Sequence, residues 1–126
     1  MKINDIEIFE KLHLQIKDIY TELSVLSKKS PDGQINKFKL KFVNQLLEQA
    51  NRFLAEKYEP FNDFTLFQEN NMPSNSDVVF VVSQYIKCLE KFKYDNIQCL
   101  SGKWFWIITD KKEQIKTSAP ILELTR

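Results

Sequence analysis

Apolar residues recur at helical spacing along three long segments of the chain, and the clearest case lies between residues 74 and 94. Ser74 and Asp77 stand at its start with the spacing of a helix N-cap and an acid that complements the helix dipole. The apolar face of the segment comprises Val78, Val81, Val82, Tyr85, Ile86, Cys88, Leu89 and Phe92. The polar face comprises Ser83, Lys87, Glu90 and Lys91. We therefore predict a central helix over about 74–94.

Two earlier segments show the same period and predict helices over about 4–29 and 34–58. The first carries an apolar stripe of Ile6, Phe9, Leu12, Ile16, Ile19, Tyr20, Leu23 and Leu26. The second has a wider apolar face of Ile35, Phe38, Phe42, Val43, Leu46, Leu47, Ala50, Phe53 and Leu54. Between them, the residues from Ser30 to Gly33 have the composition of a type I turn, which predicts an antiparallel helical hairpin.

The helical pattern stops at Pro60, and the stretch that follows is a long loop rich in phenylalanine. Phe61, Phe64 and Phe67 lie within it, among acidic residues. A loop of this length usually packs on something. We expect the loop to cover the start of the central helix, where Phe80 falls on the polar face of a helical wheel drawn for this segment.

The pattern changes to strands after residue 94. Residues 97–100 and 103–109 flank a Ser101–Gly102 turn, which predicts a hairpin, and residues 114–118 are a weaker candidate for a third strand. The chain is therefore predicted to be an α+β protein of one domain, 1–126. Its three helices precede a small antiparallel hairpin or meander over about 97–118, packed as a single sheet layer against the helices.

The strand around residue 106 is apolar on both faces. Alternation sends Trp104, Trp106 and Ile108 to one face of the sheet and Phe105 and Ile107 to the other. A small sheet packed on helices usually leaves one face in water. Two interpretations follow: either the chain itself covers both faces, or Trp104, Trp106 and Ile108 form a contact surface for a partner.

Composition indicates an ordinary globular protein. The chain has 126 residues, of which 43% are hydrophobic, and its 18 basic residues nearly balance 17 acidic ones. The amino-terminal stretch lacks the pattern of a secretion signal, and no apolar run reaches the ~20 residues of a membrane span. Two cysteines in this context indicate reduced thiols. We expect a cytoplasmic protein that does not insert into a membrane.

Residues that could perform catalysis are few. There is one histidine, His13, at the border of an apolar stripe, where a single hydrogen bond is the expected arrangement. Cys88 falls on an apolar helix face and is expected to be inert core. With two cysteines and two glycines, the chain has no zinc-ligand spacing and no phosphate-binding loop. The sequence thus predicts no catalytic residues, no metal, no cofactor and no enzymatic activity.

Lysines gather around the first predicted turn. Lys37, Lys39 and Lys41 follow Lys28 and Lys29, and Lys39 falls inside the apolar arc of its helix, as a lysine with a packed stem does. Solvated faces explain most such clusters. The leading hypothesis is a non-catalytic interaction or regulatory protein that binds another protein, or itself, through its aromatic strand. The alternative is a nucleic-acid-binding protein that uses these lysines together with stacking by Trp104 or Trp106.

Overall fold

The computed structural model describes residues 1–110 and 112–121 and contains three long helices followed by two strands. The helices are α1 (Ile3–Lys29), α2 (Lys37–Tyr58) and α3 (Asn75–Asp95), with a short 3-10 helix, η1 (Glu69–Asn71), before α3. The strands are β1 (Ile97–Leu100) and β2 (Lys103–Trp106), paired antiparallel. The predicted α+β order is therefore confirmed. In the described part of the chain, no helix is both long and apolar enough to span a membrane.

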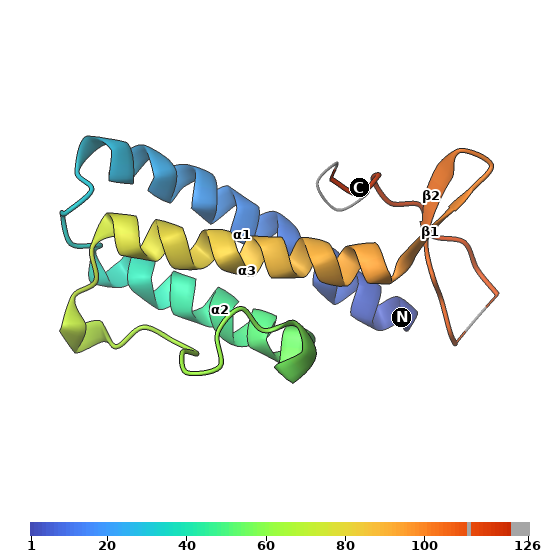
Figure 1. Ribbon diagram of the computed structural model, residues 1–126, viewed down its shortest axis with the longest axis horizontal. Coiled ribbons are helices and arrows are strands. Elements are labelled where there is room, and N and C mark those ends of the chain that lie inside the picture. Colours follow the sequence, from blue (N-terminus) through green and yellow to red (C-terminus); the bar gives the residue numbers. More distant parts are fainter. Residues whose placement is uncertain (111, 122–126) are drawn as a thin grey trace.

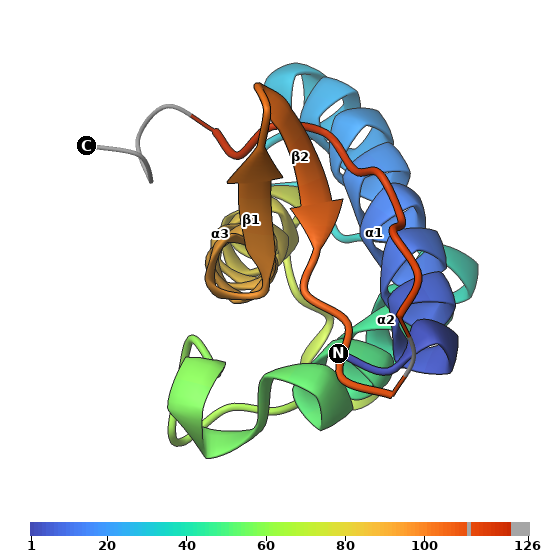
Figure 2. The same cartoon turned by 90° about the vertical axis from the view of Figure 1, so that its right-hand side faces the viewer.

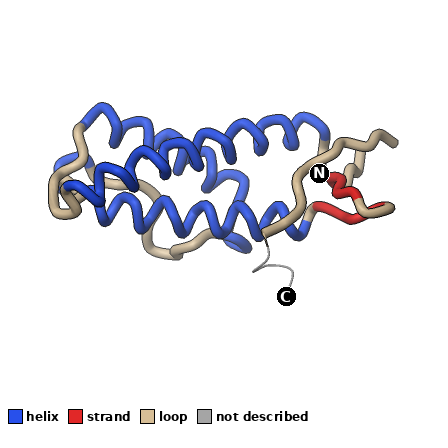
Figure 3. Tube along the Cα trace, turned by 90° about the horizontal axis from the view of Figure 1, so that it is seen from above, coloured by secondary structure: helices blue, strands red, loops and turns tan. Residues whose placement is uncertain are grey.

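The three helices lie lengthwise beside one another, and the hairpin sits at one end of them (Figures 1 and 3). α1 runs opposite to α2 and α3, and both α1 and α2 pack more extensively on α3 than on each other. Phe9, Leu47, Val82 and Leu89 are among the fully buried residues of the common core. α3 is therefore the central helix, as its apolar face predicts.

Hydrogen bonds join the turn after α1 to the start of α3. The Gly33 amide donates to the Ser30 carbonyl at 3.2 Å, which closes the predicted turn. The Asn75 amide donates to the Gly33 carbonyl at 2.8 Å, so the turn is held against the start of α3. Ser74 is the N-cap of α3, because its hydroxyl accepts from the Asp77 amide at 3.2 Å.

The second helix begins three residues later than the apolar pattern suggests. Gln34 forms a β-bridge with Ser74, and the neighbouring Ile35 amide donates to a carbonyl of the loop before α3. These bonds keep the chain extended. Asn36 is then the N-cap, and its side chain accepts from the Lys39 amide at 2.8 Å.

The loop between α2 and α3 runs back along the bundle, because these two helices point the same way (Figure 1). Two asparagines of α2 hold it: Asn44 both donates to and accepts from the Phe67 backbone at 3.0 Å, and Asn51 donates to the Thr65 carbonyl at 3.1 Å. Phe61 lies 6.5 Å from Phe80 between ring centroids. The expected packing of the loop on the start of α3 is therefore present.

The hairpin is closed by Ser101 and Gly102, both at positive φ. The chain after β2 returns alongside α1 (Figure 2) and meets β2 through backbone bonds. The Trp106 amide donates to the Ile115 carbonyl at 3.0 Å, and the Thr117 amide donates to the Trp104 carbonyl at 3.1 Å. The predicted third strand is thus a single bridge rather than a full strand.

Candidate functional site

Trp106, one of the predicted contact residues, lies in the core. It is 2% exposed, and its ring meets Phe9 of α1 edge-on at 5.3 Å. Its indole nitrogen donates to the Glu10 carboxylate at 2.8 Å. Phe105 is also buried, at 8% exposed. The chain itself therefore covers both of these neighbouring side chains, and Trp106 offers no surface to a partner.

The other two residues of the predicted tryptophan face are half-buried. Trp104 and Ile108 both pack against the edge of the core. Ile107, from the opposite face, is 38% exposed. The aromatic strand consequently presents much less apolar surface than its sequence suggests.

The start of α2, which carries the lysines, and the hairpin, which carries the tryptophans, lie at opposite ends of the molecule (Figure 1). Lys37, Lys39 and Lys41 belong to the first two turns of α2, near the start of α3, whereas the hairpin follows the end of α3. The 21 residues of α3 separate the two groups by about 30 Å. The structure does not bring the lysines and Trp104 together into one site.

Phe38 and Phe42 are the exposed aromatic pair that the sequence does not single out. Both fall on the apolar face of α2, yet Phe38 is 70% exposed and Phe42 is 46% exposed. Their rings meet edge to face at 4.9 Å between centroids. They line an open groove of about 460 Å³ between α1 and α2.

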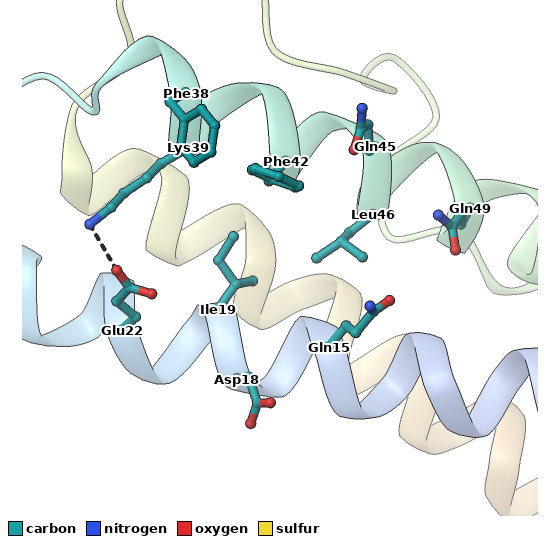
Figure 4. Close-up of a pocket in the computed structure, with 10 residues that line it drawn as sticks. All are labelled: Gln15, Asp18, Ile19, Glu22, Phe38, Lys39, Phe42, Gln45, Leu46 and Gln49. Atoms are coloured by element: carbon teal, nitrogen blue, oxygen red, sulfur yellow. Dashed lines mark ion pairs between the residues drawn. The ribbon is translucent and has the colours of Figure 1, made fainter.

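The groove has an apolar floor and polar rims. Figure 4 shows Ile19 of α1 directed toward Phe42 and Leu46 of α2, while Asp18 and Gln45 point away from one another on the two rims. This surface, defined by the groove and its two phenylalanines, is called the α1–α2 groove below. Its signal in the sequence is the width of the apolar face of α2, part of which stays exposed although α1 and α3 both pack against this helix.

Lys39 closes one end of the groove. Its ammonium lies 2.8 Å from the Glu22 carboxylate of α1, as the dashed line in Figure 4 marks. The side chain is 28% exposed, so its stem is packed and its charge is paired across the groove. Lys37 and Lys41 are exposed.

His13 and Glu90 form a buried pair between α1 and α3. The His13 imidazole donates from Nε2 to the Glu90 carboxylate at 2.7 Å, which confirms the expected hydrogen bond. Burial raises the pKa of Glu90, but the bond from His13 and the charges of Lys17 and Lys93 outweigh it and hold that pKa below its usual range. The pair bridges two helices, and both of its side chains are buried, which is the arrangement of a structural contact.

Lys93, one turn further along α3, is 4% exposed and donates to the Ser118 hydroxyl at 2.6 Å. Burial lowers the pKa of this ammonium, although the carboxylates of Glu10 and Glu90 act in the opposite direction. The charged groups of this region thus come from α1 and α3, and the segment after β2 contributes the Ser118 hydroxyl. Among the described residues, no three His, Cys, Asp or Glu side chains are placed to hold a metal ion.

The two cysteines are free thiols in different surroundings. Cys88 is half-buried beside the core rather than fully enclosed, and burial raises the pKa of its thiol. A raised pKa lowers the thiolate fraction and hence the reactivity. Cys99 is exposed on β1.

No protein-family model matches the chain, and neither a curated protein nor a solved structure shows significant similarity to it. The function is therefore inferred from the exposed groups themselves. Of these, the α1–α2 groove combines a concave apolar floor, two exposed aromatic rings and charged rims.

Proposed function

We propose that this chain is a non-catalytic cytoplasmic protein that binds another protein through the α1–α2 groove. The observation that carries the proposal is the exposure of Phe38 and Phe42, 70% and 46%, beside an apolar hollow. Single exposed apolar residues are normal, but an aromatic pair at a rimmed hollow is typical of an interaction site. The free thiols of Cys88 and Cys99 suit a reducing compartment.

The groove takes the place of the tryptophan strand as the proposed surface, because Trp106 is buried. A phenylalanine covers roughly 200 Å² when fully buried. Covering the 70% of Phe38 and 46% of Phe42 that is now exposed would remove roughly 230 Å² from water. At about 25 cal/mol per Å², this is worth at most about 6 kcal/mol, before the cost of association is subtracted.

The test compares capture of host proteins by the native chain and by a double variant, Phe38→Ser with Phe42→Ser. We expect the variant to lose the captured partner, and its affinity for that partner, once isolated, to fall at least about thirtyfold. Phe80→Ser is the matched control, since Phe80 is 57% exposed and does not line the groove. An unchanged set of captured proteins, with the fold intact by circular dichroism, would contradict the proposal.

A nucleic-acid-binding function is the second candidate, and one observation favours it. Lys37 and Lys41 are exposed close to Phe38, and single strands bind where cations accompany a stacking ring. The carboxylates of Asp18 and Glu22 line the same groove and repel phosphates. Fluorescence anisotropy of a labelled single-stranded oligonucleotide distinguishes the two proposed functions. Absence of oligonucleotide binding at low salt would exclude the nucleic-acid-binding function.

A further inference from the structure

The α1–α2 groove continues into a second hollow toward the other end of the two helices. This hollow also has a volume of about 460 Å³ and shares Gln49 with the first. Ile8, which is 44% exposed, lines it together with Phe53 and Phe92. The apolar surface therefore extends along α2 from Phe38 to Phe53, a length of about 22 Å at ~1.5 Å per residue.

The shape of this surface matches a helix. It lies between two antiparallel helices, α1 and α2, with α3 already packed against both of them. In a four-helix bundle, the fourth helix occupies a groove of this kind. A helix of about 15 residues has the same length as the groove. Its apolar residues at i, i+3/i+4 and i+7 would face Phe42, Leu46 and Ile8.

The rim on α1 is acidic. Asp5 lines the second hollow, and Asp18 and Glu22 line the first. Glu22 is paired with Lys39 at 2.8 Å. Within residues 1–110 and 112–121, neither Asp5 nor Asp18 takes part in an ion pair. Two carboxylates on the α1 side therefore remain available to a cation on the occupant.

The nearby basic residues leave this rim acidic. Arg52 lines the second hollow on the α2 side, but its guanidinium lies 2.8 Å from the Glu48 carboxylate. Lys11 is exposed on α1 and lines neither hollow.

Met1 also lines the second hollow, but its ammonium donates to the Ile107 carbonyl at 2.8 Å. Lys17, next to Asp18, is exposed and lines neither hollow. In the part of the chain that the structure describes, Asp5 and Asp18 are therefore the charged groups without an ion-pair partner that an occupant meets where α1 lines the two hollows.

We propose that the occupant of the α1–α2 groove is an amphipathic helix of a partner protein. The helix is about four turns long, with an apolar stripe on the groove and lysine or arginine residues along the flank that faces Asp5 and Asp18. It completes a four-helix bundle with α1, α2 and α3. This inference rests on the proposed function, because it names the kind of partner that the groove binds.

Synthetic peptides of about 16 residues test the inference by fluorescence anisotropy. The first peptide carries leucines at helical spacing and lysines on one flank, the second replaces those lysines by glutamates, and the third contains the residues of the first in shuffled order. We expect the first peptide to bind roughly two- to thirtyfold more tightly than the glutamate peptide, because only the first forms the two exposed ion pairs. We expect it to bind at least about tenfold more tightly than the shuffled peptide, whose leucines do not share one helical face. The advantage over the glutamate peptide should shrink with added salt.

Variants of the chain assign the binding to the groove. Phe38→Ser with Phe42→Ser should reduce the affinity of the lysine peptide to that of the shuffled one, and Phe80→Ser should not. Asp18→Lys should narrow or reverse the preference for the lysine peptide over the glutamate peptide. Amide chemical shifts should change around Phe42 and leave the hairpin unaffected.

Each contrary outcome has a separate meaning. Equal affinity for the lysine and shuffled peptides, or no binding of either, overturns the helix as occupant. If the phenylalanine double variant still loses host-protein capture in that case, the proposed function stands with a different kind of partner. If sedimentation shows self-association that the double variant abolishes, a second copy fills the groove and the helix inference is wrong. If the double variant changes neither capture nor peptide binding, both proposals fail.

Discussion

Replacing Trp106 by alanine should destabilise the fold without directly removing a binding surface. The side chain is 2% exposed, packs edge-on against Phe9 and donates to Glu10. It also joins β2 to α1 across a wide separation in sequence, so its loss affects the attachment of the hairpin to the helices. The apolar pattern of the strand is compatible with two roles for Trp106, packing in the core or contact with a partner. This variant distinguishes between them.

The magnitude follows from burial. Truncating a buried tryptophan to alanine costs about 3–5 kcal/mol, from lost transfer free energy and the remaining cavity. The bond to Glu10 adds about 0.5–1.5 kcal/mol at most, because Glu10 is exposed and water can replace the donor. Small domains are stable by about 5–15 kcal/mol, so Trp106→Ala should remove a large fraction of the free energy of unfolding. Trp104 is only half-buried, and Trp104→Ala should cost about 2 kcal/mol.

Urea unfolding followed by circular dichroism measures both losses. Fluorescence of the Trp104→Phe variant then reports Trp106 alone, whose emission should be blue-shifted and protected from iodide. The reasoning would be refuted if Trp106→Ala cost less than about 1 kcal/mol while abolishing association with a partner, since that pattern belongs to a surface residue.

Two further predictions concern the polar contacts between helices. Glu90→Ala should lower stability at neutral pH by about 3 kcal/mol, because it leaves His13 buried without its acceptor. The pKa of Glu90 is below its usual range in the folded state, so its contribution is full above about pH 4.3 and is lost as the pH falls; in urea unfolding, the difference from the native chain should therefore shrink in acid. Burial and the hydrogen bond to Asp95 raise the pKa of Tyr58 from 10.0 to about 12, so this contact stabilises the fold below pH 10 and is lost as the pH rises toward 12. Ultraviolet absorbance should show late ionisation of Tyr58 and of Tyr85, because burial also raises the pKa of Tyr85. In Asp95→Asn the ionisation of Tyr58 should move to lower pH; an unchanged titration would count against the contact.

Local patterns in the sequence were sufficient to predict the three long helices, the hairpin and their order. The three apolar stripes, the turn at Ser30–Gly33 and the cap at Ser74 depend on neighbours a few residues away, and all are present in the structure. Short-range spacing decides a helix because its hydrogen bonds and its side-chain contacts are local. The start of α2 departs from the pattern where Gln34 pairs with Ser74, a contact distant in sequence.

The burial of individual side chains could not be predicted from the sequence and became known only from the tertiary structure. The wheel places Glu90 on the polar face of α3, yet Glu90 is 8% exposed, because His13 of α1 reaches it. Lys93 is buried beside it, bonded to Ser118 of the segment after β2. A helical wheel records only the relative directions of side chains, and the neighbours that cover each direction come from distant parts of the chain.

The candidate site shows the same division. Three large aromatic side chains favour burial to a similar degree, and the periodicity of the sequence assigns all of them to apolar faces: Phe38, Phe42 and Trp106. Trp106 becomes core because α1 and the returning segment enclose it, whereas Phe38 and Phe42 remain exposed because both α1 and α2 pack chiefly on α3. The sequence by itself determined which side chains favour leaving water. The arrangement of the three helices decided which of them could do so within the chain, because a side chain is buried only where another element lies against it.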